Sequence, residues 1–124
     1  MNLSKKRRAE IREMFGGKCA YCGVELGKGW HVDHVEPVFR FGDDKKMLHP
    51  ENDRQDNLYP ACLSCNIDKG RLPLEDWRHY LSERLIDLLR KYQPKFRHAE
   101  RFERITVNPE PLVFWFEKWR AEHE

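Results

Sequence analysis

The clearest pattern along the chain is an apolar stripe between Leu74 and Tyr92. Spacings of three and four residues separate its members, which are Trp77, Leu81, Leu85, Leu88, Leu89 and Tyr92. This period predicts an amphipathic helix that packs one face on a core. Pro94 ends the predicted helix, because proline lacks the backbone donor that a helix interior needs.

Two further elements are predicted before this helix. Ser4 can cap a helix over residues 4–15, whose apolar residues fall on one face and which Gly16 and Gly17 end. Residues 30–35 contain Val32 and Val35 and predict a short strand, which Pro37 stops.

The middle of the chain is polar. Residues 41–55 are rich in turn-forming residues and predict a long surface loop. Residues 67–71 predict the start of a helix that Pro73 interrupts.

The last thirty residues are less regular. Residues 99–104 predict another turn of helix, and Ile105 to Val107 predict a short strand. Five apolar residues in a row, 112–116, fit a buried strand, a buried helix or a self-association patch. The pattern therefore leaves open whether residues 112–119 close the core or join two copies in a homodimer.

Length and composition set the scale of the fold. A chain of 124 residues predicts a single domain over residues 1–124 with one modest core. Charged residues make up 35% of it and the mean hydropathy is -0.87, so the core is small and a bound metal would add stability to the fold. No apolar stretch approaches the ~20 residues of a membrane span, and no apolar region follows the basic start as in a signal peptide. We expect a cytoplasmic protein without membrane contact, in which cysteines stay reduced.

Charge alone does not identify a partner. The chain has 23 Lys and Arg against 21 Asp and Glu, a net charge of +2. Residues 1–40 are the basic part, with eight basic groups against five acids, whereas residues 41–70 have four against six. A phosphate-binding surface and a solvated helix face explain the basic start equally well.

All four cysteines stand in two Cys-x-x-Cys pairs. Cys19 and Cys22 form the first pair and Cys62 and Cys65 the second, with 39 residues between the pairs. Two such pairs can supply the four thiolates of a tetrahedral Zn²⁺ site. Two redox pairs are the alternative, but the chain lacks the strand and helix alternation expected around them. Four thiolates leave zinc no open position for water, so we expect a structural ion, and any hydrolytic chemistry must use other groups.

The residues between and after the pairs carry a family resemblance. In order, they are Val32-Asp33-His34-Val35, Pro37, Asp56-Asn57-Leu58, Asn66 and Lys69-Gly70. With the cysteines, this order resembles the zinc-containing branch of the HNH endonucleases, the ββα-metal nucleases, over about residues 15–72. The third position of the motif, usually His, is Asn66 here, so the motif is similar to that of the endonuclease VII-type phage junction-resolving nucleases.

The resemblance implies an α+β fold. It consists of a small ββα-metal core over residues 16–72 stapled by Cys₄ zinc, a preceding helix over residues 4–15, and a mostly helical extension over residues 73–124.

The residue chemistry fits the same family. Asp33 and Asn66 offer hard oxygen ligands for Mg²⁺ or Mn²⁺, and His34 can take a proton from water. Asn57 would orient the imidazole of His34. Neighbours in a regular strand point to opposite faces, so Asp33 and His34 can share a site only if the strand bends or ends beside them.

These observations predict a metal-dependent endonuclease acting on DNA. Basic candidates for DNA contact are Lys69, which the family pattern suggests, together with Arg7, Arg8 and Arg40. The alternative is a non-catalytic zinc module that binds nucleic acid or protein, although such a module would need none of Asp33, His34, Asn57 and Asn66. The resemblance leaves roles and partners in phage packaging, restriction or recombination open.

Overall fold

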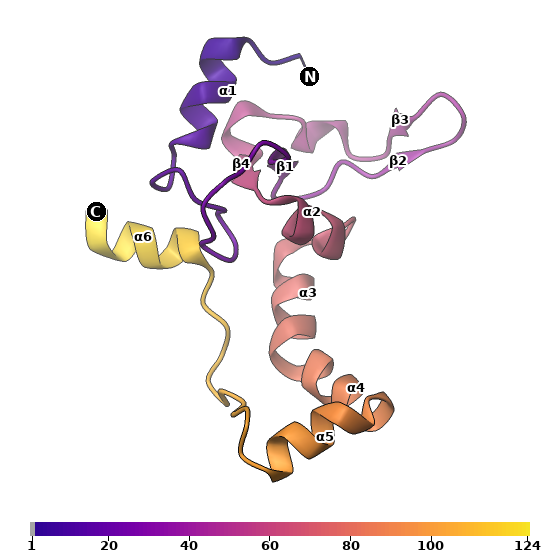
Figure 1. Cartoon of the computed structure of the whole chain (residues 1–124). Coiled ribbons are helices and arrows are strands. Elements are labelled where there is room, and N and C mark those ends of the chain that lie inside the picture. The colour runs from indigo at the N-terminus through magenta and orange to yellow at the C-terminus, as the bar shows by residue number, and fades with distance from the viewer. Residues whose placement is uncertain (1) are drawn as a thin grey trace. The chain divides into compact units, whose positions relative to one another are not determined.

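The computed structural model describes residues 2–124 and contains helices and two small antiparallel sheets, an α+β fold as predicted (Figure 1). The chain forms two compact units. The first unit comprises the chain up to Leu74 together with Val113–Glu124, and the second unit is Glu75–Leu112. The sequence predicted one domain, and the structure divides the same residues into these two units. None of the helices within residues 2–124 is long and apolar enough to cross a membrane.

The first helix, α1, spans Lys5–Arg12 and begins where the sequence predicted. The Ser4 hydroxyl accepts a hydrogen bond from the Arg7 backbone N–H at 3.0 Å, which satisfies one of the free donors at the helix start. Ile11 is fully buried. The helix ends before Phe15, and Gly16 follows with a φ of 77°.

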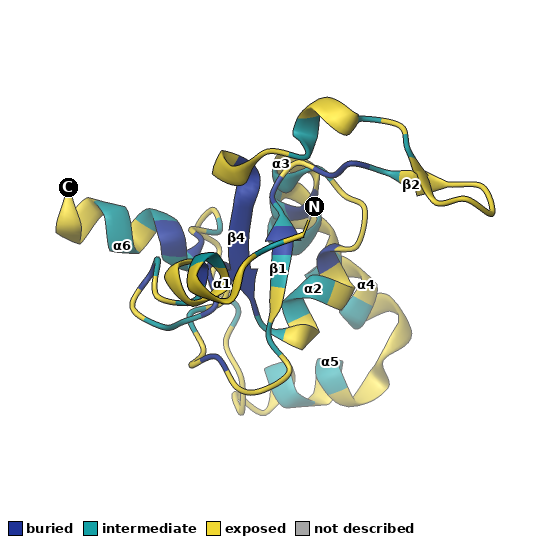
Figure 2. Cartoon of the chain, turned by 90° about the horizontal axis from the view of Figure 1, so that it is seen from above, coloured by how far each residue is buried: buried dark blue, intermediate teal, exposed yellow. Residues whose placement is uncertain are grey.

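A two-stranded antiparallel sheet lies at the centre of the first unit. Strand β1, His31–His34, pairs with β4, Leu58–Ala61, with His34 opposite Leu58 and Val32 opposite Pro60. The strand predicted around residues 30–35 is thus confirmed. Strand β4 is buried along its whole length, as Figure 2 shows.

The segment predicted as a long loop contains regular structure. Strands β2, Arg40–Phe41, and β3, Lys46–Met47, form a small hairpin. Two 3-10 turns follow, η1 at Pro50–Asn52 and η2 at Gln55–Asn57. The prediction of a long surface loop missed this hairpin, in which the turn residues between the two short strands bring the strands together.

Helix α2 spans Leu63–Lys69 and begins four residues before the predicted start. The reason is its cap: the Cys62 sulfur accepts a hydrogen bond from the Cys65 backbone N–H at 3.4 Å. Gly70 ends the helix with a φ of 52°.

Helix α6, Trp115–His123, brings the end of the chain into the core of the first unit. The Phe116 N–H donates to the Ala20 carbonyl at 2.8 Å, and the Phe116 ring lies 5.0 Å from that of Tyr59. Phe114 and Phe116 are buried, whereas Val113 is 47% exposed. Of the alternatives for residues 112–116, the structure therefore shows that the two phenylalanines close this core.

The second unit is helical. Helix α3, Leu74–His79, continues through a π-helical turn, η3 at Tyr80–Arg84, into α4, Leu85–Tyr92, and helix α5, Pro94–Arg101, follows. The predicted helix is present, but its stripe is not uniformly buried: Trp77 is 2% exposed and Tyr92 63%. Ile105 to Val107 form no strand, contrary to the prediction, because no neighbouring strand within residues 2–124 pairs with them.

Candidate active site and metal centre

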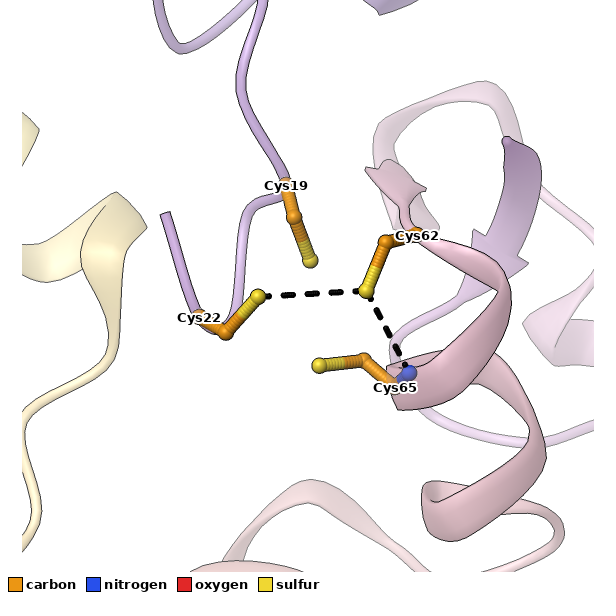
Figure 3. A group of neighbouring side chains, drawn as sticks. All are labelled: Cys19, Cys22, Cys62 and Cys65. Carbon is orange, nitrogen blue, oxygen red and sulfur yellow. Dashed lines mark hydrogen bonds between the residues drawn. The ribbon is translucent and has the colours of Figure 1, made fainter. Parts of the chain in front are cut away.

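The four cysteine side chains converge on one point (Figure 3). Their sulfur atoms all lie within 4.8 Å of one another, and the Sγ atoms of Cys22 and Cys62 are 3.8 Å apart. Tetrahedral zinc binds thiolates at about 2.3 Å, which places the sulfurs roughly 3.8 Å from each other. The donor set and its spacing therefore fit a Cys₄ zinc site.

Local backbone geometry builds each half of this cluster. In the first pair, the Tyr21 N–H donates to Cys19 Sγ at 3.4 Å, and Gly23 takes a φ of 79° just after Cys22. In the second pair, Cys62 caps α2 and Cys65 lies in its first turn. The two pairs thus meet as a loop facing the start of a helix.

The electrostatics of the cluster oppose four thiolates in the absence of a metal. A hydrogen bond from Cys65 lowers the pKa of Cys19 to about 4, which favours the thiolate. Burial raises the pKa of Cys22 to about 11. Several thiolates at this spacing repel each other, and a bound Zn²⁺ removes that cost by taking all four as ligands.

A second group of polar side chains surrounds an open pocket of about 290 Å³. Asp33 and His34 line it from the end of β1, and Asn66 lines it from α2. Strand β1 ends at His34 and the chain bends at Val35 and Glu36. This strand end lets both neighbours reach the same pocket, as the sequence argument required.

Asp33 is held in place by two buried groups. Its Oδ2 atom accepts a hydrogen bond of 2.5 Å from the Tyr21 hydroxyl and lies 3.1 Å from Lys69 Nζ. Burial and the charge of Asp33 raise the pKa of Tyr21, so the phenol keeps the proton that it donates. These contacts use one carboxylate oxygen, and the residue still lines the pocket.

Lys69 is not where the sequence placed it. It is 1% exposed, and its ammonium also donates to the His34 carbonyl at 3.0 Å. The prediction of a phosphate contact is therefore corrected, because a buried ammonium paired with Asp33 does not face a solvent-side ligand. Lys69 instead joins α2 to the end of β1.

Asn57 also differs from its prediction. Its side-chain oxygen accepts from the Glu36 N–H at 2.9 Å, and its Nδ2 donates to the carbonyls of Glu36 at 2.8 Å and Asn52 at 2.7 Å. These bonds fix the backbone directly after His34, and Asn57 does not line the pocket. It acts on the loop that leaves β1 rather than on the imidazole ring.

The ring of His34 instead contacts Asp53, which the sequence did not single out. Nε2 of His34 lies 2.9 Å from Asp53 Oδ1. This hydrogen bond lowers the pKa of Asp53. In the sequence, Asp53 is one acid among several in a polar stretch, so only the fold distinguishes it.

The predicted DNA contacts separate into two places. Arg40 is exposed and lines the pocket, as does Arg71, which the sequence did not indicate. Arg7 bonds to the Gln55 side chain at 2.8 Å, and Arg8 lies 4.1 Å above the Trp30 ring. Neither Arg7 nor Arg8 lines the pocket.

Comparison with known families places this site in a class. Residues 19–72 match the model of the HNH endonuclease family. The matched segment contains both cysteine pairs and the pocket-lining Asp33, His34 and Asn66. Residues 19–72 therefore form an HNH endonuclease domain, as the motif predicted. No curated protein sequence matched the chain.

Among solved structures, the chain is similar to the crystal structure of the Type II-C Cas9 enzyme from Actinomyces naeslundii. The TM-score is 0.47 and the sequence identity 20%. The alignment covers 96% of this chain and 14% of that enzyme, so the chain spans a small part of its length.

Proposed function

We propose that this protein is a metal-dependent DNA endonuclease that hydrolyses phosphodiester bonds by nicking or by double-strand cleavage. One observation carries the proposal: Asp33, His34 and Asn66 line one pocket inside the HNH domain. A carboxylate, an imidazole and an amide around a shared space are the groups that hydrolysis of a phosphodiester needs.

Asp33 and Asn66 would hold a Mg²⁺ or Mn²⁺ ion. Asp33 already uses Oδ2 for Tyr21 and Lys69, which leaves Oδ1 as its ligand atom, and Asn66 supplies an amide oxygen. When bound, the ion supplies positive charge that stabilises the phosphate and the departing oxygen. The absence of an imidazole at position 66 weakens any preference for softer ions such as Ni²⁺.

His34 is the general base in this proposal. Its side chain is 23% exposed at the edge of the pocket, so water can reach it. The imidazole takes a proton from the water that attacks phosphorus, the bond to the 3′ oxygen breaks, and that oxygen takes up a proton from solvent water. By the family resemblance, the products carry 5′ phosphate and 3′ hydroxyl ends.

The remaining groups serve position and binding. The Cys₄ zinc would fix α2, and with it Asn66, against the loop of the first cysteine pair. Arg40 and Arg71 would contact DNA phosphates at the pocket, because both are exposed and line it. Arg7 and Arg8 on α1 would extend the basic surface away from the pocket.

Nicking of supercoiled plasmid tests this proposal. The zinc-loaded protein should convert supercoiled to open-circular DNA with Mg²⁺ or Mn²⁺, and His34→Ala should reduce the rate by about 10²–10⁴-fold, the usual contribution of a positioned base. His31→Ala is the matched control, because His31 is exposed on the same strand and does not line the pocket.

Zinc content, measured for all three proteins, must be equal for the comparison to hold. If the wild type cleaves neither duplex, branched nor single-stranded DNA, the nuclease proposal fails. If the two histidine variants cleave as fast as the wild type, His34 is not the base.

A further inference from the structure

The acid that touches the ring of His34 is itself sheltered from solvent. The bond between His34 Nε2 and Asp53 Oδ1 measures 2.9 Å, and the two side chains are 23% and 15% exposed. A hydrogen bond between side chains on an open surface would be mobile, whereas one that is mostly shielded can hold a ring in one orientation.

The backbone around Asp53 is tied to the backbone after His34. The Asp53 N–H donates to the Pro50 carbonyl at 3.0 Å, and the Asn52 side chain donates to the Pro37 carbonyl at 2.9 Å. The Asn57 side chain bonds to Asn52 and Glu36. Two amide side chains thus fix the distance between the segment of Asp53 and the end of β1.

This arrangement dictates where the imidazole carries its proton. An ionised carboxylate only accepts hydrogen bonds, so the Nε2 atom that faces it must bear the hydrogen. In the neutral ring, Nδ1 then has the free lone pair. Within residues 2–124, the structure gives the ring of His34 no hydrogen-bond partner besides Asp53.

We propose that Asp53 is a positioning residue that holds His34 in the Nε2–H tautomer, so that Nδ1 is the atom that accepts the proton from water. The inference rests on the proposed nuclease function. The carboxylate also stabilises the imidazolium that forms when Nδ1 takes the proton, as an acid does for a histidine base in other hydrolases. Asp53 thus fills the role that the sequence assigned to Asn57.

Steady-state kinetics of Asp53→Asn provide the first test. The kcat for plasmid nicking should fall by roughly 10- to 100-fold, the usual cost of losing such a partner, while KM stays within about twofold. Asp56→Asn is the matched control, because Asp56 is an exposed acid three residues away that pairs with Arg54 on the surface. In a His34→Ala background, Asp53→Asn should cause no further loss of rate, because the proposed contribution of Asp53 to catalysis is transmitted through the ring.

The ¹⁵N chemical shifts of the His34 ring provide a second test that needs no activity. In wild-type protein at a pH where the ring is neutral, the hydrogen should sit on Nε2. An Asn amide can donate to Nε2 instead, so Asp53→Asn should move hydrogen to Nδ1 in at least part of the molecules, while Asp56→Asn keeps the wild-type shifts.

The outcomes separate the two proposals. If wild type nicks, His34→Ala does not, and Asp53→Asn nicks at the wild-type rate, the role of Asp53 is wrong and the nuclease stands. A wild-type ring protonated on Nδ1 also overturns it. If wild type nicks no DNA, the proposed function fails, and with it the positioning role of Asp53.

Discussion

Asp33 and Lys69 form a buried ion pair whose side chains are 10% and 0% exposed. Two charges in such a place are stable only together, because each would be costly to bury alone. The Tyr21 hydroxyl, at 2.5 Å from the same carboxylate, satisfies a further lone pair. This pair holds the catalytic candidate Asp33 in a fixed place, and its stability can be measured.

We expect Lys69→Met to lower the free energy of unfolding by about 3–5 kcal/mol, because it leaves the Asp33 carboxylate buried without its partner. Urea denaturation measures the loss. Lys6→Met is the control, because Lys6 is exposed on α1 and its substitution should stay within about 0.5 kcal/mol.

Adding Asp33→Asn to Lys69→Met should restore part of the loss, because the uncompensated charge is removed. A Lys69→Met protein as stable as Lys6→Met would show that the ion pair of Asp33 and Lys69 does not stabilise the fold.

The sequence predicts the chemistry of single residues better than their partners. The order of the cysteines and of Asp33, His34 and Asn66 predicted two groups of side chains, and the structure brings each group together. The sequence did not single out Asp53, and it placed Lys69 at a phosphate. Asp53 lies 19 residues from His34 in the chain and Lys69 lies 35 residues from it, so these contacts form only in the folded protein. A lysine near a helix end and an acid in a polar stretch carry no local signal.

At the level of elements, Cys62 has two structural roles. It supplies a sulfur to the cysteine cluster and accepts the capping hydrogen bond of α2. The cap explains why α2 begins at Leu63 rather than at the predicted Ile67. Strand β4 was not predicted. It contains Pro60, which is tolerated because β4 pairs with β1 alone within residues 2–124.

The substitution Cys62→Ser separates the role of Cys62 in the cysteine cluster from its role as the cap of α2. Serine is itself a good cap, so the start of α2 is kept and the loss reports on the metal. We expect zinc content to fall and the Tm to drop by about 10 °C or more, because structural zinc contributes several kcal/mol of folding free energy. Ser64→Ala, exposed on the same helix, should keep both.

A zinc chelator should lower the Tm of the wild type much more than that of Cys62→Ser. Equal zinc content and Tm in Cys62→Ser and wild type would contradict a Cys₄ site.

Gly23 is required by the turn after the first cysteine pair. Its φ is 79°, and an added Cβ would lie 3.1 Å from the Trp115 ring. We expect Gly23→Ala to destabilise the protein by about 1–3 kcal/mol, because alanine disfavours this conformation and the ring must shift. Gly29→Ala, which would meet nothing within 4 Å, is the control. Thermal or urea unfolding of the two variants measures the difference, and equal stability would show that the turn relaxes freely.

At the scale of the whole molecule, the first unit is built from two separate stretches of chain. The HNH match ends at residue 72, yet the Tyr59 ring on β4 packs on Phe116, 57 residues further along. The sequence could not decide how residues 112–116 fold, because five apolar residues in a row have neither helical nor strand periodicity. Contacts with a distant segment decide the outcome: the carbonyls of Ala20 and Tyr21 accept hydrogen bonds from the N–H groups of Phe116 and Trp115 in the folded state.

The closing segment should therefore carry much of the stability of the first unit. We expect Phe116→Ala to lower the free energy of unfolding by about 3–5 kcal/mol, because Phe116 is 6% exposed and contacts the rings of Phe15, Tyr21, Tyr59 and Phe114. Val113→Ala is the matched control three residues earlier: its side chain is 47% exposed and its loss should cost less than about 1 kcal/mol. Denaturant unfolding followed by tryptophan fluorescence measures both. If Phe116→Ala were no less stable than Val113→Ala, residues 113–124 would not contribute to the core, and residues 19–72 would form it without them.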